Sequence, residues 1–370
     1  MCPAAGETLS YLDYNASTPV LADVASAVSS AIGRFGNPSS VHSAGRRARA
    51  AVEEAREAVA AMVNARPQDV VFTSGATEAN ALALRGLAHQ GVLASAVEHP
   101  SILAHSPEVI AVDGDGVIDL AALELLLQQR KAPLLVALMF ANNETGVLQP
   151  IAQAVEIAHK YGALVHCDAV QAPGKAALDM RTMGVDSLSL SAHKFGGLKG
   201  TGALVLGPAL DLTADILGGG QERRRRAGTE NVSGIVGFGA AAAAAPRLLE
   251  EAARIAGLRA TLEAGLRAAS PTARIYAEAR PRLPNTTCVA LPGVASETQL
   301  MRLDLAGIAV SAGSACSSGK IAPSHVLLAM GVAPDEAKSA IRVSLGWENG
   351  ENDVAGFLQA WRPLAASAAA

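Results

Sequence analysis

Short apolar segments alternate with helical patterns along the first two-thirds of the chain. Residues 151–160 repeat apolar positions at helical spacing, and a second helix is expected from Thr73 to Leu84. The segments that predict strands are residues 70–72, 92–97, 134–140, 163–168, 186–190 and 203–206. Because strands that alternate with helices form a parallel sheet with helices on both faces, we expect an α/β fold.

The pattern changes after Pro246. Small apolar residues at 234–245 predict a buried helix that ends or kinks at this proline and is too short to cross a bilayer. The segments that follow predict helix, strand, helix and strand in turn: residues 248–269, 287–291, 297–305 and 308–310. We therefore expect a large domain over residues 11–245 and a smaller α+β domain over residues 246–370. Residues 1–10 are expected to belong to the smaller domain.

The composition excludes several classes of protein. The net charge is −4 over 370 residues and aromatic residues make up 3%, so neither a basic surface nor a stacking platform for nucleic acid is expected. The cysteines, at positions 2, 167, 288 and 316, lack CxxC spacing, which argues against a metal site and a disulfide framework. Residues 1–7 lack the features of a signal peptide. We expect a cytoplasmic protein that contacts no membrane.

The stretch SAHKFGG, residues 191–197, lies just beyond the strand expected at 186–190. Ligands of α/β enzymes bind at the carboxyl ends of strands, so Lys194 is a candidate to form a Schiff base with an aldehyde cofactor. Taken alone, a solvated surface lysine explains this residue at least as well. Polar residues that follow other strands favour the first interpretation.

Three of these polar residues suit a planar, nitrogen-containing ring. Asp168 ends an apolar strand, where it needs a partner such as a protonated pyridine nitrogen or a nearby arginine. Gln171 is placed to donate to a ring oxygen, or to cap a helix. His99 follows another strand, where it would stack on a ring and carry protons, or be purely structural.

Three further positions suit polar or anionic groups. Residues 75–77, Gly-Ala-Thr, open a helix whose free N–H groups would hold a phosphate, although an ordinary capped helix start has the same pattern. Asn143 would donate to a ring oxygen or serve as a turn residue. Arg342, inside an apolar strand pattern, would clamp a carboxylate, form a buried ion pair or face outward.

The stretch SAGSACSSGK, residues 311–320, surrounds Cys316 with small residues. No neighbour is large enough to bury the thiol, so the pattern predicts an exposed loop with a reactive cysteine. Cys167 and Cys288 lie in apolar strands, where a small core residue is the better interpretation. The four arginines at 223–226 are typical of a solvated charge cluster and too few to indicate nucleic-acid binding.

Together these residues make the sequence resemble the cysteine desulfurases of the NifS/IscS type, within the class V aminotransferase fold. The resemblance extends over nearly the whole chain, with its motifs in the family order. They are YLDYNASTP (11–19), GNPSS (36–40), FTSGATE (72–78), NNETG (142–146), SAHK (191–194), GT (228–229), the Cys316 loop and Ile341-Arg342. The run of arginines is denser than the family pattern.

The resemblance implies a fold, a cofactor and a set of contacts. The fold would be the PLP-dependent fold type I, with pyridoxal 5'-phosphate bound to Lys194 of a homodimeric enzyme. The phosphate contacts implied are Ala76, Thr77, Ser191, His193 and, from a second subunit, Thr229. The ring contacts implied are Asp168 at the pyridine nitrogen, Gln171 at the ring oxygen and His99 on the ring face.

The resemblance also implies the reaction, which converts L-cysteine to L-alanine. Asn143 and Arg342 would bind the substrate carboxylate, and Lys194 and His99 would move protons. Cys316 would accept the sulfur as a persulfide, in a loop that resembles the long-loop group of the family. A long loop suits delivery of the sulfur to another protein.

Two other functions stay open at this stage. A selenocysteine lyase or another class V enzyme would share the site, although a transaminase has no use for Cys316. A catalytically idle assembly subunit has no need of Lys194, Asp168, His99 and Arg342 together. Iron–sulfur cluster assembly, tRNA thiolation and DNA sulfur modification would all use the same site, so the destination of the sulfur stays open too.

Overall fold

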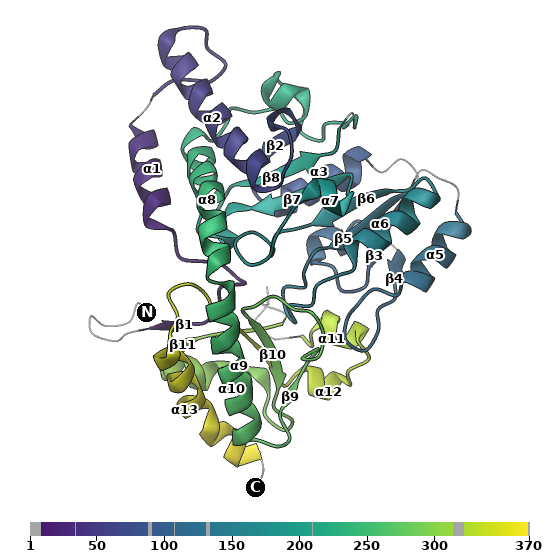
Figure 1. Cartoon of the computed structure of the whole chain (residues 1–370), viewed down its shortest axis with the longest axis vertical. Coiled ribbons are helices and arrows are strands. Elements are labelled where there is room, and N and C mark those ends of the chain that lie inside the picture. Colours follow the sequence, from purple (N-terminus) through teal and green to yellow (C-terminus); the bar gives the residue numbers. More distant parts are fainter. Residues whose placement is uncertain are drawn as a thin grey trace.

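The structure is a computed structural model. It describes residues 9–33, 35–87, 91–106, 108–130, 134–208, 210–313 and 322–368. Cys316 and Cys2 lie outside these residues. Two sheets of different size lie in the upper and lower parts of the molecule as Figure 1 shows it.

A seven-stranded sheet is the centre of the upper part. Its strands, in spatial order, are β2 (Val70–Thr73), β8 (Gly202–Leu206), β7 (Ser187–Ser191), β6 (Leu164–Asp168), β5 (Leu135–Met139), β3 (Val92–Ser95) and β4 (Glu108–Ile110). Strands β7, β6, β5, β3 and β4 are parallel, whereas β8 is antiparallel to both of its neighbours. The mainly parallel sheet confirms the α/β fold, and each of the six strands expected up to residue 206 is present. Strand β4 was not predicted.

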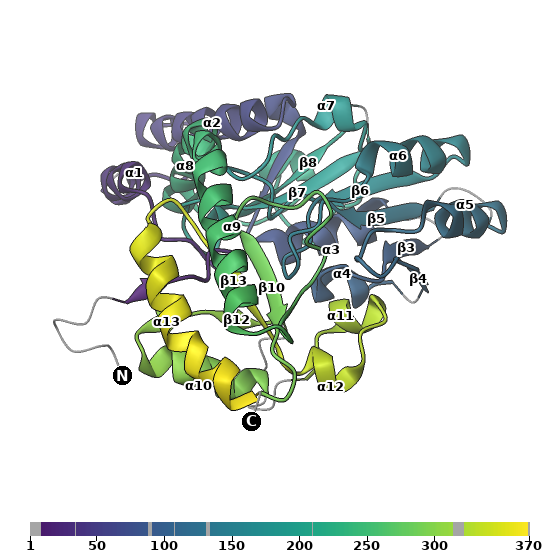
Figure 2. The same cartoon turned by 60° about the horizontal axis from the view of Figure 1, so that its bottom comes forward.

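Both faces of this sheet are buried. The helices that surround it are α1 (Ala22–Ile32), α2 (Ser43–Met62), α3 (Ala76–Leu87), α4 (Pro100–Leu103), α5 (Leu120–Gln128), α6 (Ile151–Lys160), α7 (Met180–Met183) and α8 (Val232–Glu250). Alternate strand residues enter different clusters: Val136 packs with side chains of α2, α5, α6 and α8, and Leu135 packs with those of α3. Figure 2 shows α5 and α6 on the opposite face of the sheet from α3. Two-sided burial explains why these strands read as apolar runs.

Helix α8 does not end at Pro246 but continues to Glu250. It packs between α1 and α2, with Gly239 against Ala55 so closely that a Cβ would lie 2.6 Å from the Ala55 Cα. Among the described residues it is the one helix long and apolar enough to cross a membrane, and it extends beyond residues 234–245, where the sequence predicted a helix too short to do so. Half of it is buried inside the protein, as in the core helix of a globular fold.

The lower part contains a four-stranded antiparallel sheet. Its order is β12 (Ser311–Ala312), β13 (Ala340–Ser344), β10 (Thr286–Ala290) and β9 (Arg274–Ile275). Around it lie α9 (Ala252–Ala269), α10 (Ser296–Leu305), α11 (His325–Ala329), α12 (Pro334–Ala337) and α13 (Glu351–Ala368). The strand and helix expected near 287–291 and 297–305 are confirmed. The helix expected over 248–269 is instead the end of α8 and the whole of α9, which meet at Glu251.

The first described residues join the two parts. Strand β1 (Ser10–Tyr11) pairs with β11 (Ile308–Ala309), and Leu12 belongs to the hydrophobic cluster of α9 and α13. Further along, the Thr18 N–H donates to the carbonyl of His193, next to Lys194, at 2.9 Å. The N-terminal segment therefore runs from the lower sheet to the carboxyl edge of the upper one. The expected domain boundary at 245/246 falls inside α8 and stays a prediction.

Candidate active site

A pocket of about 600 Å³ opens where the carboxyl ends of β5, β6 and β7 face the lower sheet. The predicted site residues that line it are Ala76, Thr77, His99, Asn143, Asp168, Gln171, Ser191, His193, Lys194 and Arg342. Thr229 is exposed and does not line it. The structure therefore gathers the predicted residues that it describes, apart from Thr229.

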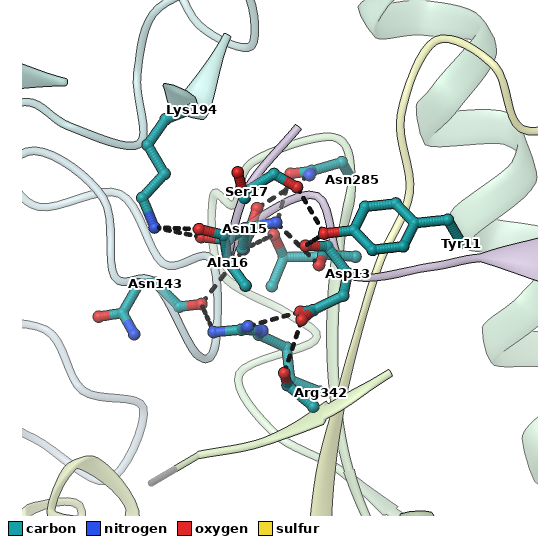
Figure 3. A network of polar contacts seen from close by, with 12 residues as sticks. Tyr11, Asp13, Asn15, Ala16, Ser17, Asn143, Lys194, Asn285 and Arg342 are labelled. Carbon is teal, nitrogen blue, oxygen red and sulfur yellow. Dashed lines mark hydrogen bonds and ion pairs between the residues drawn. The ribbon is translucent and has the colours of Figure 1, made fainter. Parts of the chain in front are cut away.

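Lys194 ends a short 3₁₀ helix that follows β7 directly. Its Nζ donates to the main-chain carbonyls of Asn15, at 2.6 Å, and Ala16, at 3.0 Å (Figure 3). Burial, helped by the charge of Arg342, lowers the pKa of Lys194 to about 8, although Asp168 and Asp13 act in the opposite direction. An amine in this state loses its proton near physiological pH, as a nucleophile toward an aldehyde must.

Asp168 ends β6 with its carboxylate oriented by two donors. The Asn80 side-chain amide donates to Oδ2 at 2.9 Å, and the Val170 N–H donates to Oδ1 at 3.1 Å. No arginine in the described residues pairs with it, so the ion pair considered as an alternative is absent. Each oxygen keeps a lone pair for a donor in the pocket.

The start of α3 offers open space and free donors to an anion. A Cβ at Gly75 would meet nothing within 4 Å, and the first N–H groups of the helix have no partner within it. Glu78 fixes this turn, because it accepts from the Ser74 N–H at 2.7 Å and pairs with Arg226. Burial lowers the pKa of His193 to about 4, so its ring contributes a neutral hydrogen-bonding group.

His99 and Gln171 are each held in one orientation. The Ser101 N–H donates to His99 Nδ1 at 3.1 Å, so the neutral ring carries its proton on Nε2. Burial lowers the pKa of His99, which favours that neutral form. Lys175 donates to Gln171 Oε1 at 2.8 Å, and Gln171 Nε2 donates to the Asn15 carbonyl at 2.9 Å. One N–H of Gln171 stays available for an acceptor.

Arg342 lines the pocket and also forms the buried ion pair that its sequence left open. Its Nη2 lies 2.7 Å from Asp13 Oδ1, and its Nη1 donates to the Asn143 carbonyl at 3.1 Å (Figure 3). Its Nε is buried without a partner. Because Nε has no exposed surface, an anionic ligand in the pocket would instead contact the N–H groups of Nη1 and Nη2 that Asp13 and Asn143 do not use.

Sequence reasoning assigned no role to several residues of the site. Asp13 and Asn15 belong to the quoted YLDYNASTP motif, which was the only signal available for them. Lys175 and His325 lie in stretches without a recognised pattern. Glu144 is buried beside Ser324, whose hydroxyl donates to it, and burial raises its pKa. Apart from Lys175, which contacts Gln171 four residues away, each depends on contacts between distant segments.

The arginine run is only partly the solvated cluster expected: Arg223 and Arg224 are exposed, whereas Arg225 and Arg226 are half-buried and bonded. Arg226 pairs with Glu78, and Arg225 donates to the Gln68 carbonyl at 2.9 Å. Just before them, Glu222 forms a buried two-bond ion pair with Arg56, at 2.7 and 2.8 Å. The run therefore fastens its loop to the start of α3 and to α2.

The donors of this pocket fit pyridoxal 5'-phosphate. The open cradle at Gly75 suits the phosphate, and the free lone pairs of Asp168 suit a protonated ring nitrogen. Lys194 supplies an amine of lowered pKa for the aldehyde. A parallel sheet with this lysine beyond one strand and this aspartate at the end of the next defines a pyridoxal-phosphate enzyme.

The comparisons identify the family. The aminotransferase class-V model matches residues 10–357, so the chain belongs to that family. A cysteine desulfurase of Cereibacter sphaeroides is 44% identical over 352 residues, which cover 90% of each chain. A NifS-like protein from Rickettsia africae superposes with a TM-score of 0.90 at 37% identity, over 96% of this chain and 99% of that one. Within the family, the chain therefore belongs to the cysteine desulfurases of the NifS/IscS type.

Another similar structure contains bound cysteine. SspA in complex with cysteine superposes with a TM-score of 0.78 at 30% identity, over 92% of this chain and 99% of that one. The relatives thus share the fold over nearly the full length of this chain.

Proposed function

We propose that this protein binds pyridoxal 5'-phosphate at Lys194 and converts L-cysteine to L-alanine, passing the sulfur to Cys316. The observation that carries the proposal is the pocket itself, where Lys194, with a pKa lowered to about 8, meets Asp168, His99 and Arg342. The similarity to SspA, whose structure contains cysteine, supports this substrate. An idle subunit or an enzyme for another amino acid is not favoured by the relatives.

Arg342 and Asn143 would receive the substrate carboxylate. The N–H groups of Arg342 that Asp13 and Asn143 do not use provide donors, and the Asn143 side chain lines the same pocket. Asp13 keeps the guanidinium in place from behind through its 2.7 Å ion pair. The carboxylate is thereby held on the side of the pocket that belongs to the lower sheet.

Lys194 and His99 would handle the protons. A lysine with a pKa of about 8 is partly neutral at physiological pH, so Lys194 takes the proton from the substrate Cα. When bound, pyridoxal 5'-phosphate would act as an electron sink for the charge left on that carbon. His99, neutral through burial, exchanges protons with the substrate through its ring.

The sulfur step balances without an external oxidant. The Cys316 thiolate attacks the substrate sulfur, a sulfur–sulfur bond forms, and the bond between that sulfur and Cβ breaks with its electron pair going to carbon. A proton on Cβ completes alanine, and Cys316 is left as a persulfide. The carbon is reduced because it gains the pair of electrons that the two sulfur atoms together lose.

A single cysteine substitution tests the assignment. Cys316→Ser is expected to abolish sulfide release from L-cysteine under reducing conditions while the visible absorbance of the bound cofactor stays unchanged. Cys2→Ser makes the same chemical change elsewhere and is expected to keep full activity. Full sulfide release by Cys316→Ser would contradict the proposal. Alanine release from selenocysteine compared with cysteine separates the lyase alternative.

We also propose a homodimer with a shared phosphate site. Thr229 is exposed on the loop that the arginine run fastens, as a residue that reaches a neighbouring subunit must be. Thr229→Ala should then weaken cofactor binding in a protein that sediments as a dimer. The persulfide would pass to a sulfur-acceptor protein in the cytoplasm. The domains proposed are residues 11–245 and 246–370.

A further inference from the structure

A line of buried polar side chains lies behind Asp168, on the side away from the pocket. Asn80, on α3, donates to Asp168 Oδ2 at 2.9 Å. His166, on β6, places Nε2 3.0 Å from Asn80 Oδ1 and Nδ1 2.9 Å from the Ser187 hydroxyl. Asn80, His166 and Ser187 are each 0% exposed, and none of them lines the pocket. Neither substrate nor cofactor would touch them.

The direction of donation is the same in every hydrogen bond of this line: each group donates to the neighbour that lies nearer to Asp168. A carboxylate only accepts hydrogen bonds, so Asn80 presents its NH2 group to Asp168 and its oxygen to His166. His166 must then donate from Nε2, which leaves Nδ1 to accept from the Ser187 hydroxyl. The orientation of each group fixes the next one, from Ser187 to Asp168.

His166 is suited to this single arrangement because it is neutral. Burial lowers the pKa of His166 to about 3, so the ring keeps one proton and one lone pair over the physiological range. A protonated ring would present a donor to the Ser187 hydroxyl as well and would remove the acceptor that orients it.

Asn80 also reaches His99. Its second amide N–H donates to the Ser101 hydroxyl at 2.9 Å, and that oxygen lies 2.8 Å from His99 Nδ1. Both N–H donors of the Asn80 amide are therefore used, and its oxygen accepts one bond. A change at Asn80 or His166 would disturb the groups at the ring nitrogen and at the ring face together.

We propose that His166 and Asn80 are positioning residues, which hold the Asp168 carboxylate with its free lone pairs toward the pocket and His99 with its proton on Nε2. This inference rests on the proposed function, in which Asp168 meets a protonated ring nitrogen. It predicts that a donor at position 166, and not merely a side chain that fills the space, is needed for full catalysis.

Two substitutions at His166 separate these possibilities. His166→Gln keeps an amide donor for Asn80 and an acceptor for Ser187, whereas His166→Leu fills the space without either. We expect His166→Leu to lower kcat for alanine formation about tenfold to a hundredfold, because Asn80, without its His166 donor, no longer holds its hydrogen bond to the charged Asp168 in place. Its visible cofactor band should shift, while KM for L-cysteine stays within about twofold. His166→Gln should restore most of kcat and the band position.

A control and a cofactor-free measurement complete the test. Ser189→Ala removes a fully buried hydroxyl that has no partner, from the strand that carries Ser187, and should leave kcat and the band unchanged. In the cofactor-free protein, ¹⁵N NMR should show the His166 ring neutral, with its proton on Nε2, between pH 5 and 8. The signals of His166 are assigned by their absence from the spectrum of His166→Gln.

The outcomes are distinguishable. Equal kcat and equal spectra in wild type, His166→Leu and His166→Gln would overturn the inference while leaving the desulfurase function intact. A proton on Nδ1 of His166, or its titration in this pH range, would overturn the orientation even if His166→Leu does not fold. A wild-type protein that binds no pyridoxal 5'-phosphate and forms no alanine would refute the proposed function instead, and the NMR result would still decide the orientation.

Discussion

Arg56 and Glu222 form the ion pair on which the loop of the arginine run depends. The two carboxylate oxygens lie 2.7 and 2.8 Å from the guanidinium, and the side chains are 4% and 3% exposed. Arg56 also donates to the Val70 carbonyl at 2.8 Å, and Glu222 accepts from the Phe72 N–H at 2.8 Å. The pair thus connects α2, β2 and the loop.

The loop needs this anchor because its backbone is strained. Glu222, Arg223 and Arg224 have φ values of 45°, 56° and 66°, a left-handed backbone conformation that residues other than glycine rarely adopt. Each such residue costs on the order of 1 kcal/mol or more, so the three together oppose the loop conformation by about 3 kcal/mol. The pair holds the loop in this conformation through its bonds to the Val70 carbonyl and the Phe72 N–H.

Arg56→Met removes the cation and leaves the Glu222 carboxylate buried without it. Breaking a buried pair in this way destabilises a protein by about 3–5 kcal/mol, which we expect as the loss of free energy of unfolding in urea. Arg85→Met, which breaks the exposed pair with Asp215, is the matched control and should cost less than about 1 kcal/mol. Because Glu222→Gln removes the stranded charge, the double variant Arg56→Met/Glu222→Gln should recover part of the loss. Equal urea midpoints for Arg56→Met and Arg85→Met would refute the reasoning.

Two further predictions concern the amine of the site and a helix contact. In the cofactor-free protein, Lys194→Met should be the more stable chain at pH 7, because folding lowers the Lys194 pKa from 10.5 to about 8. Between these pH values the unfolded chain binds more protons than the folded chain, so the unfolding free energy of the wild type rises from pH 8 to 10.5. The difference in unfolding free energy between Lys194→Met and the wild type, measured by urea titration, should therefore be smaller at pH 10.5 than at pH 8. A difference that is equal at the two pH values would contradict this. Gly239→Ala should lower the unfolding free energy by about 1–3 kcal/mol, because its Cβ would lie 2.6 Å from the Ala55 Cα. Gly257→Ala, whose Cβ meets nothing within 4 Å, should leave stability equal or raise it, and thermal melts of both variants check the contrast.

The part of the site that the sequence predicts is the part built by neighbouring parallel strands. Asp168 ends an apolar strand and Lys194 follows a strand of alternating polar and apolar residues, and parallel strands bring such positions to one edge of a sheet. The direction of β8 was not evident, because an apolar run buried on both faces reads the same in either direction. His99 and the start of α3 follow the same rule as Asp168.

The contacts that the sequence does not reveal join segments far apart. Arg342 was recognised as a carboxylate clamp or a buried ion pair, but its partner Asp13 lies 329 residues away and no local pattern connects them. Lys175 orients Gln171 from one turn further along, in a stretch that reads as an ordinary loop. The sequence does not show that Arg226 pairs with Glu78, or that Glu222 beside the run pairs with Arg56, because these partners lie 148 and 166 residues apart and meet only in the folded chain.

The N-terminal segment between the two sheets sets the order in which the site is completed. Asp13 forms an ion pair with Arg342, and the Tyr14 N–H donates to the Ser344 carbonyl at 3.1 Å. Residues synthesised early in translation therefore pair with residues synthesised late. All strands of the seven-stranded sheet are synthesised by Leu206, long before Arg342 and Ser344. Because contacts of such long sequence separation form slowly, we expect the ion pair of Asp13 with Arg342 to form in a late folding step. A nascent chain released before β13 would have its upper sheet and no working centre.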